Sequence, residues 1–199
     1  MDLSFHPLSL EAIDQAGAEA LCLFVAEDER PLGGLAGLTD WRLAGKLSRM
    51  LRAGLVTGAS GEALLTPAGA RLAFGKLFVF GLGKAQSEEE LTARLSDALR
   101  RLAQAGVREA ALQLPSRLPA EVGVRTLMET EHSLARALLF APEPGKMVTA
   151  LSQEASLPPM ERRTVKISPP APAAPKPPPQ TGPQRYVPPP PKEPKKKRR

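Results

Sequence analysis

Residues 76–105 read KLFVFGLGKAQSEEELTARLSDALRRLAQA and contain a strand, a turn and a helix in succession. The first six residues are mostly apolar and predict a buried strand, and Gly81-Leu82-Gly83-Lys84 predicts the turn that leaves it. Ser87 and Glu90 have the spacing of a capping box, and the apolar residues that follow repeat at helical intervals. A helix is therefore expected over residues 87–105. A strand followed by an amphipathic helix is the repeating unit of α/β proteins.

The rest of the chain up to residue 168 alternates between strand and helix patterns. Further strands are expected at residues 3–8, 19–26, 62–66 and 109–114, with an edge strand at 161–167, and helices at residues 39–53 and 119–140. The run at residues 19–26 is continuously apolar, as expected for a strand that is buried on both faces. Together these elements predict one α/β domain, a mixed β-sheet flanked by helices in three layers.

Composition changes sharply near residue 169. The segment 169–199 holds 13 of the 22 prolines, and its only large apolar residues are Tyr186 and Val187. A segment with so little apolar surface cannot offset the entropy cost of becoming ordered. We therefore expect a folded domain at residues 1–168 and a disordered proline-rich tail at residues 169–199.

The positive charge of the protein is concentrated in this tail. The tail has eight basic residues and one acid, whereas residues 1–168 have 19 bases and 20 acids, so the pI of about 9.8 is a property of the tail. Five bases end the chain and predict contact with phosphates, an acidic protein surface or anionic lipid: Lys195, Lys196, Lys197, Arg198 and Arg199. The alternative is a solubilising tail without a partner. The prolines favour a polyproline II spacer or a ligand for an aromatic groove. Tyr186 is the only aromatic residue of the tail, so bases have little to stack on and any nucleic-acid binding is expected to be independent of sequence.

Cysteine content and hydropathy limit the possible classes of protein. The single cysteine, Cys22, excludes an internal disulfide and a cysteine-based zinc site, and its apolar neighbours predict a buried thiol. No segment approaches the ~18 apolar residues of a membrane span, and the N-terminus lacks a signal-peptide pattern. We expect a cytoplasmic protein.

Three segments in the middle of the chain resemble, in their order, a known family. They are residues 45–51 (GKLSRML), 58–65 (GASGEALL) and 76–84 (KLFVFGLGK). These segments resemble a helix, a strand and a second strand ending in a turn, which follow in this order in the N-terminal domain of the leucyl aminopeptidases, a family of metallopeptidases. Residues 131–135 resemble that family's domain-connecting helix and residues 163–167 the strand after it, although His132 stands where a small residue is usual.

The resemblance implies a macro-domain-like fold, with helices on both sides of a mixed sheet, over residues 3–167. In that family catalysis belongs to a C-terminal domain, which binds two metal ions through a lysine, several aspartates and a glutamate. No segment of this sequence resembles those motifs. The resemblance therefore implies ancestry and architecture, and it assigns no catalytic residue, metal ligand or cofactor.

The residues themselves offer little catalytic chemistry. Glu129 and His132 have the spacing of a carboxylate–imidazole ligand pair on a helix, but one such pair without a second is more often a surface pair. Glu131 is expected on the apolar face of the same helix as a structural acid. His6 is the other imidazole, and neither histidine belongs to a recognisable nucleophile motif. The acids at residues 27–29 are interpreted as a solvated loop edge.

Two glycine-rich turns are candidate ligand loops, because macro domains bind ADP-ribose at loops in this kind of fold. The candidates are Gly33, Gly34, Gly37, Gly81, Gly83 and Lys84. Neither turn has the spacing of a Rossmann fingerprint or a P-loop, and the acids at residues 88–90 would repel an anion, so close packing is the alternative.

Three functions are compatible with these observations. The preferred one is a non-catalytic interaction or scaffold protein with a protein partner, whose tail attaches to a polyanionic or acidic surface. The second is a macro-type module that binds a nucleotide or ADP-ribose, which a cleft beside the glycine-rich turns would favour. The third is an accessory subunit of a separate catalytic aminopeptidase chain. An enzyme is not expected.

Overall fold

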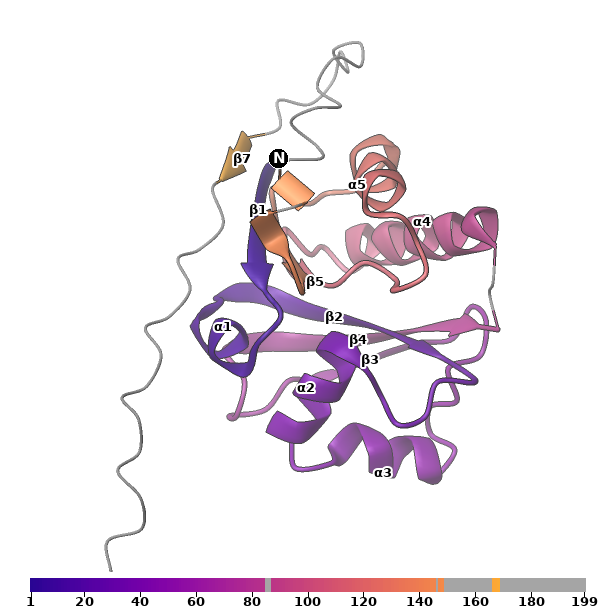
Figure 1. The fold of residues 1–199 in the computed structure, drawn as a ribbon. Coiled ribbons are helices and arrows are strands. Elements are labelled where there is room, and N and C mark those ends of the chain that lie inside the picture. The colour runs from indigo at the N-terminus through magenta and orange to yellow at the C-terminus, as the bar shows by residue number, and fades with distance from the viewer. Residues whose placement is uncertain (85–86, 146, 149–165, 169–199) are drawn as a thin grey trace, which may run out of the picture.

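The computed structural model describes residues 1–84, 87–145, 147–148 and 166–168. Its helices and strands are shown in Figure 1. In chain order they are β1 (Asp2–Pro7), α1 (Leu10–Gln15), β2 (Ala18–Ala26), α2 (Gly34–Arg42), α3 (Lys46–Arg52), β3 (Ala63–Pro67), β4 (Phe74–Gly83), α4 (Glu88–Gln104), β5 (Glu109–Leu112), α5 (Ala120–Glu129), β6 (Arg136–Ala141) and β7 (Lys166–Ser168).

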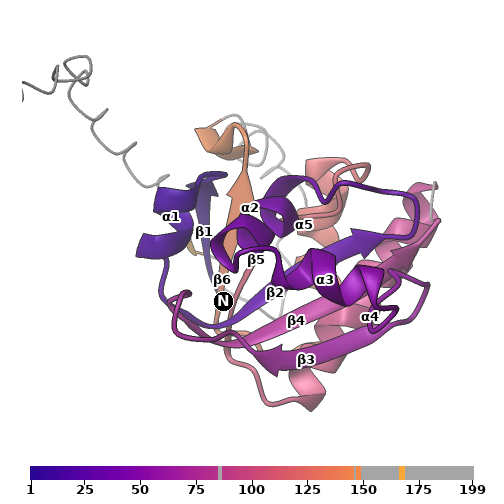
Figure 2. The same ribbon diagram turned by 90° about the horizontal axis from the view of Figure 1, so that it is seen from below.

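The strands form one mixed sheet in the order β3-β4-β2-β5-β6-β1-β7. All neighbouring pairs are parallel except β3 and β4, which are antiparallel. Helices α4 and α5 cover one face of the sheet, and α1, α2 and α3 cover the other (Figures 1 and 2). The predicted fold class, a mixed sheet between helices, is confirmed.

The register of the strands explains how one sheet supports two apolar layers. A continuous row of paired residues crosses five strands toward α4 and α5: Phe78, Cys22, Leu112, Leu139 and Phe5. The residues one position earlier in the chain point to the other face, where Leu21, Leu77 and Leu138 pack with the α1–α3 layer. This alternation is the period-2 geometry of strands, and it requires the continuous apolar runs seen in the sequence.

Helix α4 forms as its sequence predicts. The Glu90 N–H donates to Ser87 Oγ at 3.2 Å, and the Ser87 N–H donates to Glu90 Oε2 at 3.2 Å. This capping box satisfies two of the N–H groups that a helix start leaves without partners. One apolar face of the helix is fully buried against the sheet: Leu91, Leu95, Ala98, Leu99 and Leu102.

The predicted helix over residues 119–140 is wrong beyond Glu129, where α5 ends. Residues Arg136–Ala141 instead form strand β6 between β5 and β1, and five of its six residues are buried. Leu134 and Leu138 have helical spacing from Leu127 of α5, which explains the wrong prediction. The unbroken apolar run that starts at residue 137 is the stronger signal, because it suits a strand buried on both faces.

The predicted helix over residues 39–53 is two helices, α2 and α3. The chain turns between them at Ala44 and Gly45, which have φ values of 53° and 79°. Asp40, only 9% exposed, accepts hydrogen bonds from the Leu47 N–H at 2.8 Å and the Ser48 N–H at 3.1 Å. A buried carboxylate therefore caps α3 and fixes its direction relative to α2.

The remaining elements agree with the sequence except for one short helix. The strands expected at residues 3–8, 19–26, 62–66, 76–81 and 109–114 are β1 to β5 within a few residues. Helix α1 was not expected; its N-cap is Ser9, whose hydroxyl accepts from the Ala12 N–H at 3.2 Å. Of the expected edge strand at residues 161–167, the structure describes residues 166–167, which belong to β7 and pair with β1. Residues 161–165 and the tail at 169–199 lie outside the described residues.

Candidate functional site

A cleft opens at the carboxyl edge of the sheet, where the connections from two adjacent parallel strands diverge. The chain leaves β2 toward α2 on one face, and it leaves β5 toward α5 on the other face (Figure 1). Such a divergence leaves a crevice outside the strand ends, which is the usual ligand position in open α/β sheets. The cleft has a cavity volume of about 80 Å³, and the surrounding empty space, open solvent included, is about 450 Å³.

The cleft is lined by both apolar and polar groups. Cys22 and Phe24 of β2 line its floor together with Leu82 of β4, and Leu114 and Pro115 after β5 form one side. Complete burial raises the pKa of the Cys22 thiol far above its usual value, because the thiolate would lose its hydration. Cys22, predicted to be buried, is therefore a packing residue and not a nucleophile.

The opposite side of the cleft is the N-terminus of α2. Gly33 is its N-cap and provides no side-chain hydrogen bond, and Gly34 has a φ of +51°. Instead, the Leu35 N–H donates to Gln113 Oε1 at 2.6 Å, across from the segment that follows β5. A Cβ built on Gly34 would overlap the same Gln113 oxygen. Glycine here allows the helix start to approach the Gln113 side chain.

Glu29 lies beside the same helix start. A Cβ built on Gly33 would lie 2.6 Å from Glu29 Oε1. The Glu29 carboxylate and the Gln113 amide therefore both lie against the start of α2, while Ser116 adds an exposed hydroxyl nearby.

Of the six candidate ligand-loop residues, Gly33 and Gly34 line the cleft. Gly37 is required by close packing, because a Cβ added at this position would overlap the Leu32 carbonyl oxygen. The turn predicted at residues 81–84 is wrong for its first three residues, because strand β4 continues to Gly83. Gly81 and Gly83 are buried against residues 58–60, and Lys84 is exposed outside the residues that line the cleft.

The residues that sequence reasoning missed are Glu29, Gln113 and Ser116. The sequence contains a signal for these residues, which is their position after predicted strands: Glu29 follows β2, and Gln113 and Ser116 follow β5. Carboxyl ends of neighbouring parallel strands meet at one edge of a sheet.

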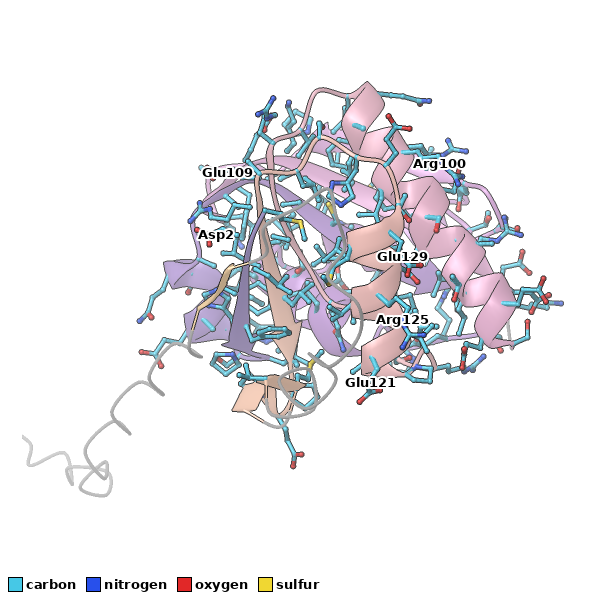
Figure 3. The ribbon with its side chains drawn as sticks, turned by 90° about the horizontal axis from the view of Figure 1, so that it is seen from above. Asp2, Arg100, Glu109, Glu121, Arg125 and Glu129 are labelled. Carbon is cyan, nitrogen blue, oxygen red and sulfur yellow. The ribbon has the colours of Figure 1, made fainter. Side chains whose placement is uncertain are left out.

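Glu129 and His132, interpreted from their spacing as a surface pair on one helix rather than as metal ligands, do not share a helix, and His132 is not at the surface. Glu129 is exposed at the end of α5, in line with Glu121 and Arg125 along the outer side of that helix (Figure 3). His132 is buried beyond the helix, where its Nε2 lies 2.7 Å from the Leu127 carbonyl oxygen and its Nδ1 accepts from the Leu134 N–H at 3.1 Å. The imidazole ties the end of α5 to the start of β6.

Two other sequence interpretations of this region are also corrected. Residues 131–135, which resemble a domain-connecting helix, are not helical, and Glu131 is exposed rather than on an apolar helix face.

His6 on β1 packs with its ring centroid 5.6 Å from that of Phe140, and its Nε2 lies 3.0 Å from Ser4 Oγ. Burial, and secondarily the charge of Arg136, lowers the pKa of His6. Among the described residues no three His, Cys, Asp or Glu side chains gather to hold a metal ion.

Two further predictions concern the tail and the membrane. The five terminal bases, Lys195 to Arg199, lie outside the described residues. None of the helices in the described part of the chain is both long and apolar enough to cross a bilayer.

The architecture is an α/β fold similar to that of macrodomains. A macrodomain from Trypanosoma brucei, solved in complex with ADP, superposes with a TM-score of 0.55 at 14% identity, over 75% of this chain and 66% of its own. A macrodomain from Oceanobacillus iheyensis with ADP gives a TM-score of 0.53 at 14% identity, over 72% of this chain and 87% of its own.

The family itself is shown by sequence. The family model described as the cytosol aminopeptidase family, N-terminal domain, matches residues 21–135, more than half of the chain, so the chain belongs to that family. A variant of tomato leucine aminopeptidase has the same fold, with a TM-score of 0.54 at 16% identity over 76% of this chain. The chain spans 35% of the length of the tomato enzyme. No curated protein matches the sequence. The predicted resemblance to the leucyl aminopeptidase N-terminal domain is confirmed.

Proposed function

We propose that the domain is a non-catalytic binding module of the macro type, and that the cleft at the carboxyl edge of β2, β4 and β5 holds a small ligand. The observation that carries the proposal is the position of this cleft between the diverging exits of β2 and β5. Its lining combines apolar side chains with a carboxylate, an amide and a hydroxyl at separate points, and ligand sites combine the same kinds of group. This favours the second of the three functions expected from the sequence.

The class of ligand that we propose contains a nucleoside. Two macrodomains of the same fold were solved with ADP. In the present chain Phe24, Leu82 and Leu114 supply apolar surface for a planar base, and the Gln113 amide and the Ser116 hydroxyl supply hydrogen-bonding groups.

The chemistry of the cleft supports binding rather than catalysis. The described residues that line it include no histidine, lysine or arginine. The one thiol there, Cys22, is buried and held in its protonated form. Nucleophilic catalysis requires a nucleophile within hydrogen-bonding reach of a base, and the lining residues supply no such pair.

Titration calorimetry with adenosine, ADP and ADP-ribose tests this proposal. We expect saturable one-site binding of at least one of these ligands, and its loss in Ser116→Trp, where the indole fills the mouth of the cleft. Gln104→Trp is the matched control, because Gln104 is an exposed residue that precedes β5 and so lies at the opposite edge of the sheet. The proposal fails if none of the three ligands binds at millimolar concentration, or if both variants lose binding equally.

We also propose, from the sequence, that the tail attaches to polyanions. Five adjacent bases end a chain whose first 168 residues are nearly neutral. Neutralising about four or five duplex phosphates predicts a slope of roughly −4 for log K against log salt concentration. Fluorescence anisotropy with two unrelated labelled duplexes should give equal affinities, and alanine at all five positions should abolish binding. A strong preference for one duplex would contradict a purely electrostatic contact.

A further inference from the structure

The charge that lines the cleft is negative. Glu29 is the only charged side chain among the described residues that line it. Two bases of the neighbouring segments are already engaged. Arg30 donates to the carbonyl oxygens of Ala26, Glu29 and Thr57 at 2.6–2.9 Å, and Arg117 lies 3.7 Å from Asp28 in an ion pair. Within the part of the chain that the structure describes, no basic side chain therefore lines the cleft.

The helix starts at this edge of the sheet are also supplied with carboxylates. A helix N-terminus attracts anions through its first N–H groups and its dipole. Helix α4 carries three acids in its first turn, at residues 88–90, and α5 carries Glu121 in its first turn. Helix α2 has no acid in its first turn, and there Glu29 takes that place from the preceding loop.

At α2 this arrangement involves the cleft directly. The Leu35 N–H, which would otherwise face the cleft, is bound to Gln113 Oε1 at 2.6 Å. The Glu29 carboxylate lies against Gly33 at the same helix start. An incoming phosphate would therefore meet a bound N–H group and a like charge, which is unfavourable at close range.

We propose that Glu29 is the specificity-determining residue of the cleft and that it makes the cleft select an uncharged nucleoside over a nucleotide. This inference rests on the proposed function, because it concerns which nucleoside-containing ligand the same cleft accepts. Gln113 assists by occupying the Leu35 N–H. The selectivity is electrostatic, so it should weaken as ionic strength rises.

Calorimetry of the full chain with adenosine and ADP tests the proposal. In the wild type we expect ADP to bind at least about tenfold more weakly than adenosine, the effect of one uncompensated like-charge contact near a protein surface. Glu29→Gln removes the charge and keeps the shape of the side chain. It should bring the two affinities within about threefold while adenosine binding changes little.

Glu27→Gln is the matched control, because Glu27 is an exposed acid of the same loop that does not line the cleft. It should leave the preference for adenosine unchanged. Tighter binding of ADP than of adenosine to the wild type, or an equal response of both variants, would overturn the role of Glu29 and leave the proposed function intact. Failure of adenosine and ADP to bind any variant would overturn the role of Glu29, and failure of ADP-ribose as well would overturn the proposed function itself. Thermal melts of each variant establish that the domain is folded.

Discussion

Two glycine-rich turns leave adjacent parallel strands at the same edge of the sheet, yet they meet different surroundings. The turn after β2 places Gly33 and Gly34 at the surface, where an added Cβ would meet the ends of the Glu29 and Gln113 side chains. The β4 turn, residues 81–84, starts within strand β4, where Gly81 and Gly83 are buried against residues 58–60, and the chain turns at Lys84. Whether a glycine serves a ligand site or a packing contact depends on what its missing Cβ would touch.

Gly81→Ala should give the largest effect, because the added Cβ would overlap the backbone at Ala59 and Gly58, which has no room to move. We expect a loss of about 3 kcal/mol in the free energy of unfolding, at the upper end of overpacking costs. Urea unfolding followed by circular dichroism measures it. Gly75→Ala on the same strand is the control, because its Cβ would lie at an ordinary 3.5 Å from the Glu19 carbonyl oxygen. Equal effects of the two variants would contradict the packing role of the β4 turn.

Glu62→Ala tests the loop against which the β4 turn packs. The Glu62 carboxylate accepts from the Thr57 N–H at 2.9 Å and from the Gly58 N–H at 2.7 Å, so it holds residues 57–61 in shape. We expect a loss of about 2 kcal/mol, as for other charge-assisted hydrogen bonds to backbone groups. Glu62→Gln retains one acceptor oxygen and should lose less. A stability change within about 0.5 kcal/mol for Glu62→Ala would mean that the loop keeps its shape without the carboxylate.

Elements with a local signal are those that the sequence predicts correctly. The capping box and apolar stripe of α4 lie within one segment, and the apolar run of β2 indicates its own burial. The run of β6 carries the same signal, but residues 134 and 138 continue the helical spacing of α5 and conceal it. The break between α2 and α3 depends on Asp40, whose carboxylate acts on residues 47 and 48 after the chain has turned.

The site is less predictable because it joins distant segments. Gln113 bonds a helix start 78 residues earlier in the chain. Only the parallel pairing of β2 with β5 brings these segments together. The sequence offered both glycine turns as candidates, and no local feature distinguishes the one that borders the cleft from the one packed against residues 58–60.

Arg30 connects the surroundings of the two turns and sharpens the comparison between them. Its guanidinium donates to the Ala26 carbonyl oxygen at 2.7 Å and to the Thr57 carbonyl oxygen at 2.9 Å, which joins the loop after β2 to the loop before β3. Arg30→Ala should cost about 1 kcal/mol, because the side chain is exposed and the freed carbonyls can bind water. Arg30→Lys keeps the charge without the planar donor set and should recover only part of the loss. Complete recovery by lysine would mean that the charge alone matters.

Gly33→Ala should have the smallest effect on stability. Its φ of −98° and ψ of 178° are extended values that alanine adopts freely. The added methyl group meets only Glu29 Oε1 at 2.6 Å, and the end of a flexible side chain can turn aside. The lower entropy of the unfolded alanine chain favours the variant, and the preference for glycine over alanine at an N-cap opposes it. We expect a net change within about 0.5 kcal/mol in urea unfolding.

Gly34→Ala is the matched contrast within the same turn. Its φ of +51° is strained for alanine, and the Cβ would displace the Gln113 oxygen that binds the Leu35 N–H. A loss of about 2 kcal/mol follows from strain and a broken hydrogen bond together. If Gly33→Ala were as costly as Gly34→Ala, Glu29 would be held rigidly in place. A side chain held that firmly would be part of the packing, as residues 58–60 are for the β4 turn, and the difference between the two turns would disappear.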